Sequence, residues 1–245
     1  MAKVAVIIPA AGAGERFGGK VKKPFAQIDN RPIFIRSIEL FLNRKDVAQV
    51  ILTVSPDDLD VVKEKYAANI MFMGIKLVKG GATRFESVRA ALSAVDEDAD
   101  LVCIHDAVRP CVLQSWIDKV FEQATTTGAA ILAAPLHGTI KRVKEKRIVA
   151  TVPRAGLFEA QTPQVFERGL LAEAYSKLEK MDKSRISDDA QLVEAMGRKV
   201  AVVETDSSNI KITRKIDVAI AEAIIKARPR PKAEGYLGPY GEAQW

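Results

Sequence analysis

Apolar segments of strand length alternate along the chain with amphipathic segments of helical length. Short apolar runs are typical of buried parallel strands, and apolar positions three and four residues apart are typical of the helices that cover them. The expected strands are residues 4–9, 49–55, 75–78, 101–105, 129–134 and 200–204. The expected helices are residues 32–42, 86–95, 115–126, 167–178, 189–196 and 217–227. This alternation predicts an α/β fold with a mostly parallel sheet and helices on both faces.

Most of the net positive charge lies in one segment. The formal net charge of the 245 residues is +6, and residues 141–154 alone carry +5. Residues 140–152 alternate apolar and basic side chains, which predicts an exposed two-stranded ribbon. The ribbon lacks the interleaved aromatic side chains of a base-stacking surface, so we expect no nucleic-acid partner.

Composition is typical of a soluble globular protein, with 48% hydrophobic and 28% charged residues. No apolar segment approaches the roughly 20 residues that span a bilayer, so no membrane role is expected. The chain has only two cysteines, which favours a reducing compartment, the cytoplasm. No Ser/Gly-rich linker interrupts residues 1–227, which predicts one domain, and residues 228–245 form a Pro- and Gly-containing tail.

A turn rich in glycine and alanine follows the first predicted strand. Residues 9–18 read Pro-Ala-Ala-Gly-Ala-Gly-Glu-Arg-Phe-Gly. Small side chains let backbone N–H groups approach a ligand closely, so such a turn can hold a polyphosphate. Phe17 replaces the third glycine of a dinucleotide fingerprint, and Val21 replaces the hydroxyl residue of a P-loop, so neither motif fits well. A tight turn without a ligand is the alternative interpretation.

Four cations accompany this turn: Arg16, Lys20, Lys22 and Lys23. Fixed cations beside a run of backbone amides match the charge of a nucleotide triphosphate. The alternative for any one of the lysines is a solvated side chain in a loop.

Asp106 directly follows the predicted strand 101–105. Open α/β sheets bind their ligands at the carboxyl ends of the strands, and a carboxylate there can hold Mg²⁺ between phosphate oxygens. The alternative is an aspartate that caps the next turn. Strand alternation directs Asp106 away from Cys103 and His105, which argues against a transition-metal site made from the three.

Five motifs stand in a fixed order, at residues 9–16, 80–88, 105–110, 162–164 and 209–213. In combination they resemble the 2-C-methyl-D-erythritol 4-phosphate cytidylyltransferase family of the non-mevalonate isoprenoid pathway, over residues 4–227. The resemblance implies a Rossmann-like nucleotidyltransferase domain that transfers CMP from CTP to this polyol phosphate and releases pyrophosphate. Two alternatives remain open: a cytidylyltransferase for another polyol phosphate, such as ribitol 5-phosphate, and a catalytically silent nucleotide-binding protein.

The resemblance also implies roles for individual residues, carried over position by position. The implied catalytic residues are Arg16, Lys23, Lys211 and Arg154, and Asp106 is the implied ligand of Mg²⁺. The implied substrate contacts are Ala10, Ala11, Gly12, Gly81, Ser87, Ala107, Arg109, Thr139, Thr162 and Ser187. In the family a β-arm, here at about residues 137–156, joins two copies of the chain, and the arginine that matches Arg154 enters the partner's active site. The resemblance therefore implies a homodimer.

Three positions depart from the family pattern. The chain reads Lys22-Lys23-Pro24 where the family usually reads Pro-Lys-Gln, so either lysine could be the catalytic one, and the register favours Lys23. Ala82 stands where an acidic residue is common. Ser187 replaces a frequent threonine but keeps the hydroxyl, and its alternative role is the N-cap of the following helix.

Overall fold

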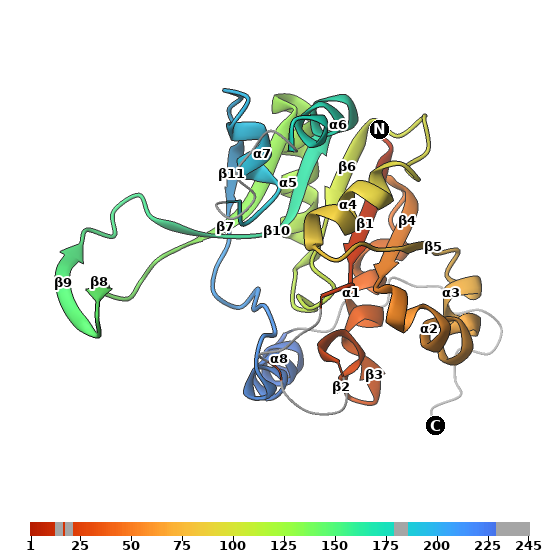
Figure 1. The fold of residues 1–245 in the computed structure, drawn as a ribbon, viewed down its shortest axis with the longest axis horizontal. Helices are drawn as coiled ribbons and strands as arrows, with labels where there is room; N and C mark the ends of the chain where they lie inside the picture. The colour runs from red at the N-terminus through yellow and green to blue at the C-terminus, as the bar shows by residue number, and fades with distance from the viewer. Residues whose placement is uncertain (13–16, 18–21, 179–185, 229–245) are drawn as a thin grey trace.

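The fold is built on one seven-stranded sheet with the order β11-β7-β10-β6-β1-β4-β5 (Figure 1). The computed structural model describes residues 1–12, 17, 22–178 and 186–228. The strands are β1 (Val4–Pro9), β4 (Val47–Val54), β5 (Lys76–Lys79), β6 (Leu101–Ile104), β7 (Ala129–Pro135), β10 (Phe158–Glu167) and β11 (Ala201–Glu204). Strand β10 is antiparallel to both of its neighbours, and the other pairs are parallel. The predicted α/β class and the mostly parallel sheet are confirmed.

Helices cover both faces of this sheet. Along β1, Val6 and Ile8 pack into one apolar cluster and Ile7 into another, as expected for a strand whose side chains alternate between faces. Helices α1 (Ile33–Leu42) and α5 (Gln114–Thr127) cover the first face. Helices α4 (Arg84–Leu92), α6 (Arg168–Ser176) and α7 (Ala190–Glu194) cover the second. Because both faces are buried, the central strands consist of continuous apolar runs.

A smaller apolar cluster lies beyond the carboxyl ends of the strands. It joins β2 (Gln27–Ile28), the start of α1 and helix α8 (Lys215–Ala227) to the loop after β6. Ile212 is fully buried in this cluster, and its backbone N–H donates to the carbonyl of Val108 at 2.9 Å. This contact brings the segment that carries Lys211 beside the loop that carries Asp106. Further short elements are β3 (Arg31–Pro32), the 3-10 helices η2 (Lys23–Phe25) and η3 (Pro56–Asp58), α2 (Leu59–Lys65) and α3 (Ala67–Phe72).

Between β7 and β10 the chain forms a hairpin that stands away from the sheet (Figure 1). Its strands, β8 (Ile140–Lys144) and β9 (Arg147–Val152), pair with each other in a separate two-stranded sheet. Glu145 and Lys146 form the turn, both with positive φ, as a two-residue turn of the right twist requires. The predicted exposed ribbon is confirmed, and residues 137–156 are called the β-arm below.

Strand β10 is the one strand of the seven-stranded sheet that the hydrophobic pattern does not predict. Gln161, Thr162 and Gln164 are polar but almost fully buried, and the Thr162-Pro163 peptide bond is cis. Polar residues and a proline in the middle of a strand remove the apolar run by which a buried strand is recognised.

In the described part of the chain, no helix combines the length and the apolar character needed to cross a membrane. Of the predicted tail, residues 228–245, only Arg228 lies within the described residues.

Candidate active site

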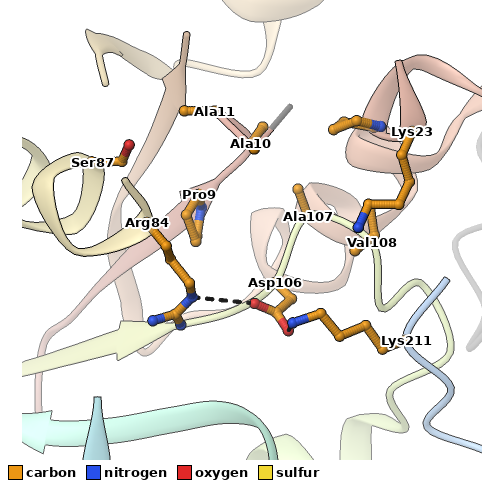
Figure 2. Close-up of a pocket in the computed structure, with 12 residues that line it drawn as sticks. Pro9, Ala10, Ala11, Lys23, Arg84, Ser87, Asp106, Ala107, Val108 and Lys211 are labelled. Atoms are coloured by element: carbon orange, nitrogen blue, oxygen red, sulfur yellow. Dashed lines mark ion pairs between the residues drawn. The ribbon is translucent and has the colours of Figure 1, made fainter. Parts of the chain in front are cut away.

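A pocket opens at the carboxyl ends of β1 and β6, where the sheet order reverses around β1. Its lining residues are Pro9, Ala10, Ala11, Gly12, Lys23, Pro24, Arg84, Ser87, Asp106, Ala107, Val108 and Lys211. β1 pairs with β4 on one side and β6 on the other, and crevices at such switch points are where open α/β sheets bind ligands. The first, second, third and fifth sequence motifs therefore meet in one cavity (Figure 2).

Asp106 is the acidic residue of this pocket, and three cations surround it. Its carboxylate lies 2.8 Å from Lys211 Nζ, 3.4 Å from Arg109 Nε and 3.6 Å from Arg84 Nε. Figure 2 shows Arg84 and Lys211 on opposite sides of the carboxylate. Burial alone would raise the pKa of Asp106, but the charges of Lys211, Arg84 and Arg109 together lower it well below its usual range. Asp106 is therefore ionised throughout the physiological pH range.

A buried hydrogen-bond chain fixes the backbone of Asp106. His105 Nε2 lies 3.1 Å from the carbonyl oxygen of Arg109, which can only accept, so Nε2 carries the proton. His105 Nδ1 then accepts from the Thr162 hydroxyl at 3.2 Å. Thr162 Oγ1 in turn accepts the backbone N–H of Asp106 at 3.0 Å. The predicted contact residues Thr162 and Arg109 thus lie behind Asp106 and position it.

We expect His105 to make the fold sensitive to acid. Burial lowers the pKa of His105 to about 4, against an ordinary value of 6.5. The unfolded state therefore binds more protons than the folded state between these values, and stability falls as the pH drops from about 6.5 towards 4. The full difference corresponds to about 3 kcal/mol of unfolding free energy. Urea unfolding at a series of pH values from about 7 to 4 measures it.

His105→Asn should flatten this pH dependence, because the buried titrating ring is gone. His137→Asn is the matched control, since His137 is the other histidine of the chain and is exposed. Equal slopes for His105→Asn and the unmodified protein would contradict the assignment.

Ala10, Ala11 and Gly12 and the start of α4 form the wall of the pocket opposite Asp106. The Ala10 N–H donates to Thr53 O at 2.8 Å, which ties the turn to the end of β4. A Cβ on Gly80 would lie 2.8 Å from Ser87 Oγ and 2.9 Å from the Cβ of Ala11, so only glycine allows these segments to touch. Ser87 is fully buried, donates to Thr83 O at 2.9 Å and accepts the N–H of Gly81 at 3.1 Å.

The two neighbouring lysines have different surroundings. Lys23 begins η2 and lines the pocket, together with Pro24. Lys22 Nζ instead lies 2.8 Å from the carboxylate of Asp58, which is not among the residues that line the pocket. The geometry therefore favours Lys23, rather than Lys22, as the lysine that faces a ligand.

Among the described residues, six of the predicted site residues do not line this pocket: Gly81, Arg109, Thr139, Arg154, Thr162 and Ser187. Arg16 lies outside the described residues. Thr139 and Arg154 are exposed on the β-arm, where Arg154 donates to the carbonyl of His137. Ser187 is exposed, and its N–H and hydroxyl both donate to Gln191 Oε1, at 2.5 and 3.2 Å. Ser187 is not the N-cap of α7, which begins after Asp189.

Arg84 lines the pocket and was not singled out by the sequence. Besides Asp106, it pairs with Asp189 at 2.6 Å, and Asp189 also accepts the Tyr175 hydroxyl at 2.5 Å. Burial acts against the charge of Arg84, but Asp189 and Asp106 outweigh it and raise the pKa. The capping box between Thr83 and Glu86 fixes the helix start that carries Arg84. Arg84 is the first residue of α4, and no local feature of the sequence distinguishes it from an ordinary polar residue of a helix start.

The donor set of the pocket fits a metal ion that prefers oxygen ligands. Within the described residues, no three His, Cys, Asp or Glu side chains cluster as a metal site. Asp106 is the acidic residue among those that line the cavity. An ionised carboxylate completed by phosphate oxygens is the usual way in which proteins hold Mg²⁺ at a nucleotide, so the residues fit this ion.

The sheet is doubly wound, and its switch point carries a small-residue turn, flanking cations and one acidic residue. This arrangement is typical of a nucleotide-binding α/β protein of the nucleotidyltransferase type. The model of the family 2-C-methyl-D-erythritol 4-phosphate cytidylyltransferase (IspD) matches residues 4–227. The chain belongs to this family.

Individual relatives agree with the family model. The 2-C-methyl-D-erythritol 4-phosphate cytidylyltransferase of Rhodopirellula baltica is 44% identical over 236 residues, which cover 91% of this chain and 95% of the relative. The enzyme of the same name from Endomicrobium trichonymphae is 39% identical, with 92% and 100% covered. The crystal structure of that enzyme from Thermus thermophilus superposes with a TM-score of 0.76 at 33% identity, with 91% and 99% covered.

Proposed function

We propose that this protein transfers CMP from CTP to 2-C-methyl-D-erythritol 4-phosphate and releases pyrophosphate, a step of isoprenoid precursor synthesis. Family membership and the names of the relatives support both substrates. The observation that carries the proposal is the cluster of Asp106 with Lys211, Arg84 and Arg109 beside the small-residue turn. A cavity with this excess of fixed positive charge suits two phosphate-bearing reactants that repel each other.

In the proposed reaction, a phosphate oxygen of the acceptor attacks the α-phosphorus of CTP in line. The new P–O bond forms as the bond from the α-phosphorus to the bridging oxygen of the β-phosphate breaks, and that electron pair leaves with pyrophosphate. The acceptor phosphate is already an anion, so no protein base or nucleophile is needed. Lys23 and Lys211, together with Arg16, offset the repulsion and stabilise charge on the phosphoryl oxygens.

We further propose Mg²⁺ as the cofactor, with Asp106 as its protein ligand. When bound, the ion neutralises phosphate charge and acts as a Lewis acid. The low pKa of Asp106 supports this role, because the carboxylate stays ionised as a metal ligand must.

Pyrophosphate release tests the function directly. Purified protein with CTP and Mg²⁺ should release pyrophosphate rapidly when 2-C-methyl-D-erythritol 4-phosphate is added, and much more slowly with ribitol 5-phosphate. Faster pyrophosphate release with ribitol 5-phosphate would overturn the proposed acceptor. CTP binding with no pyrophosphate release in the presence of any polyol phosphate would overturn the proposed activity.

The homodimer is a proposal that rests on the β-arm. Val143, Ile148 and Val149 are exposed on its two strands, and Leu157 and Phe158 are exposed where it joins β10. Apolar side chains gathered on a projecting hairpin favour burial against another surface. The proposed dimer also gives roles to Thr139 and Arg154, which would contact the acceptor phosphate in the partner's pocket.

A mixing experiment tests whether Arg154 acts across the dimer. Arg154→Ala and Lys211→Ala should each be nearly inactive. In a heterodimer of the two, one pocket keeps Lys211 and receives an intact Arg154 from the partner. Random mixing should therefore recover about a quarter of the unmodified activity, from half of the dimers with one working site each. No recovery after subunit exchange, verified by mass-tagged chains, would contradict an action of Arg154 in trans.

A cytoplasmic location stays a prediction. It is supported by the two cysteines, Cys103 and Cys111, which are free and buried. Burial raises the pKa of the Cys111 thiol to about 11, so it stays protonated and unreactive at neutral pH.

A further inference from the structure

Lys22 takes part in a local cluster that the proposed reaction does not use. Its Nζ lies 2.8 Å from Asp58 and 3.5 Å from Ser55 Oγ. The Ser55 hydroxyl donates to the same Asp58 carboxylate at 2.5 Å. Ser55 and Asp58 are buried, with 9% and 8% of their surface exposed. The carboxylate is therefore fixed before Lys22 binds it, which reduces the entropy lost in forming the ion pair.

This cluster connects two walls of the pocket. Ser55 follows β4 directly, and the last residues of β4 accept backbone N–H groups from Ala10 and Gly80, which belong to the turn and to the α4 loop. Lys22 is the residue immediately before η2 and is extended, with φ −65° and ψ 146°. The ion pair thus ties the start of η2 to the same strand end that holds the nucleotide-side loops.

Aromatic packing holds the far end of η2. Phe25 packs against Phe34 and Tyr66, with ring centroids 5.6 and 6.1 Å apart, and this contact holds the far end of the short helix. Lys23 lies between the two attachments. A three-residue helix held at both ends gives the Lys23 side chain a fixed origin.

We infer that Lys22 is a positioning residue, which acts through its ion pair with Asp58 to hold Lys23 in the pocket. The inference rests on the proposed function, in which Lys23 stabilises charge on the reacting phosphates. A cation on a displaced backbone contributes little to the transition state, because a misplacement of about 1 Å is enough to cost a large factor in rate. Of the two adjacent lysines, Lys23 thus stabilises charge on the reacting phosphates, and Lys22 fixes the position of Lys23.

A double-mutant cycle tests this. Lys22→Met and Asp58→Asn should each lower kcat by on the order of tenfold, with a smaller change in the KM for CTP. The double variant Lys22→Met/Asp58→Asn should be no worse than either single one, since both break the same ion pair. Lys22→Arg should restore most of the rate, because it keeps the charge facing Asp58.

Lys3→Met is the matched control. Lys3 forms an ion pair of similar length, 2.6 Å, with Asp98, just before β1 and so at the opposite end of this strand from the pocket. Its removal should leave kcat unchanged. Melting temperatures of all variants show whether a loss of rate comes from a loss of stability.

The outcomes separate this inference from the proposed function. If Lys22→Met keeps its kcat while Lys23→Ala is inactive, the positioning role is wrong and the function stands. The role would also be overturned if the losses in kcat of the two single variants multiplied in the double variant. The same holds if Lys3→Met lost as much kcat as Lys22→Met for an equal fall in melting temperature. If Lys23→Ala keeps near-normal turnover, it is the catalytic assignment of Lys23 that fails.

Discussion

Replacing Lys211 by alanine is expected to lower turnover by about a hundredfold or more. Lys211 Nζ lies 2.8 Å from Asp106 at the pocket wall, where it can stabilise charge that develops on the phosphoryl oxygens. Its segment is held by the buried Ile212, so the charge is fixed before substrates bind. Steady-state measurement of pyrophosphate release gives kcat and KM separately.

Lys215→Ala is the control for Lys211→Ala. Lys215 is exposed at the start of α8, four residues further along the chain, and carries the same charge. Its removal should change turnover little. If Lys211→Ala turned over at a near-normal rate, the proposed role of this lysine in the transition state would be wrong.

Replacing Asp106 by asparagine is expected to affect both activity and stability. Turnover should fall by at least about a hundredfold, because asparagine cannot supply the anionic oxygen that the proposed Mg²⁺ needs. The unfolding free energy should fall by about 3 kcal/mol, since Arg84, Arg109 and Lys211 then face one another without their shared anion. Activity as a function of Mg²⁺ concentration and urea unfolding measure the two effects.

The stability effect of Asp106→Asn has a defined pH dependence. Because the pKa of Asp106 is lowered on folding, its stabilising contribution is complete above the ordinary aspartate value and is lost as the pH falls below it. The difference between the variant and the unmodified protein should therefore be constant near neutrality and shrink in strong acid. Asp98→Asn, at an exposed ion pair, is the control. Equal stability of Asp106→Asn and the unmodified protein at pH 7 would show that the three cations do not need this carboxylate.

The sequence predicts those parts of the site that follow from strand periodicity. Asp106 and the turn at Ala10–Gly12 come directly after apolar runs, and parallel strands bring their carboxyl ends to one edge. Strand β10 is missed because Thr162 and Gln164 satisfy their polar groups internally, through His105, Asp106 and residues near α7, which a local pattern cannot show.

Other features depend on tertiary contacts with no local mark. Arg84 looks like an ordinary polar residue in the first turn of a helix, and only the fold brings Asp189 and Asp106 to it. Lys22 and Lys23 are chemically equal neighbours, and the position of Asp58 distinguishes them. Thr139 and Arg154 lie on a hairpin that leaves the body of the chain, so their proposed roles would depend on a second molecule.

The hairpin β8–β9 has a thermodynamic consequence. Within the described part of the chain its strands pair only with each other, and an isolated two-stranded hairpin is barely stable in water. In the proposed dimer, ordering of the hairpin and association of the chains are therefore linked equilibria, and each strengthens the other. Progressive dilution should lower the activity per milligram of protein while CTP continues to bind. The specific activity of the enzyme would therefore depend on its own concentration.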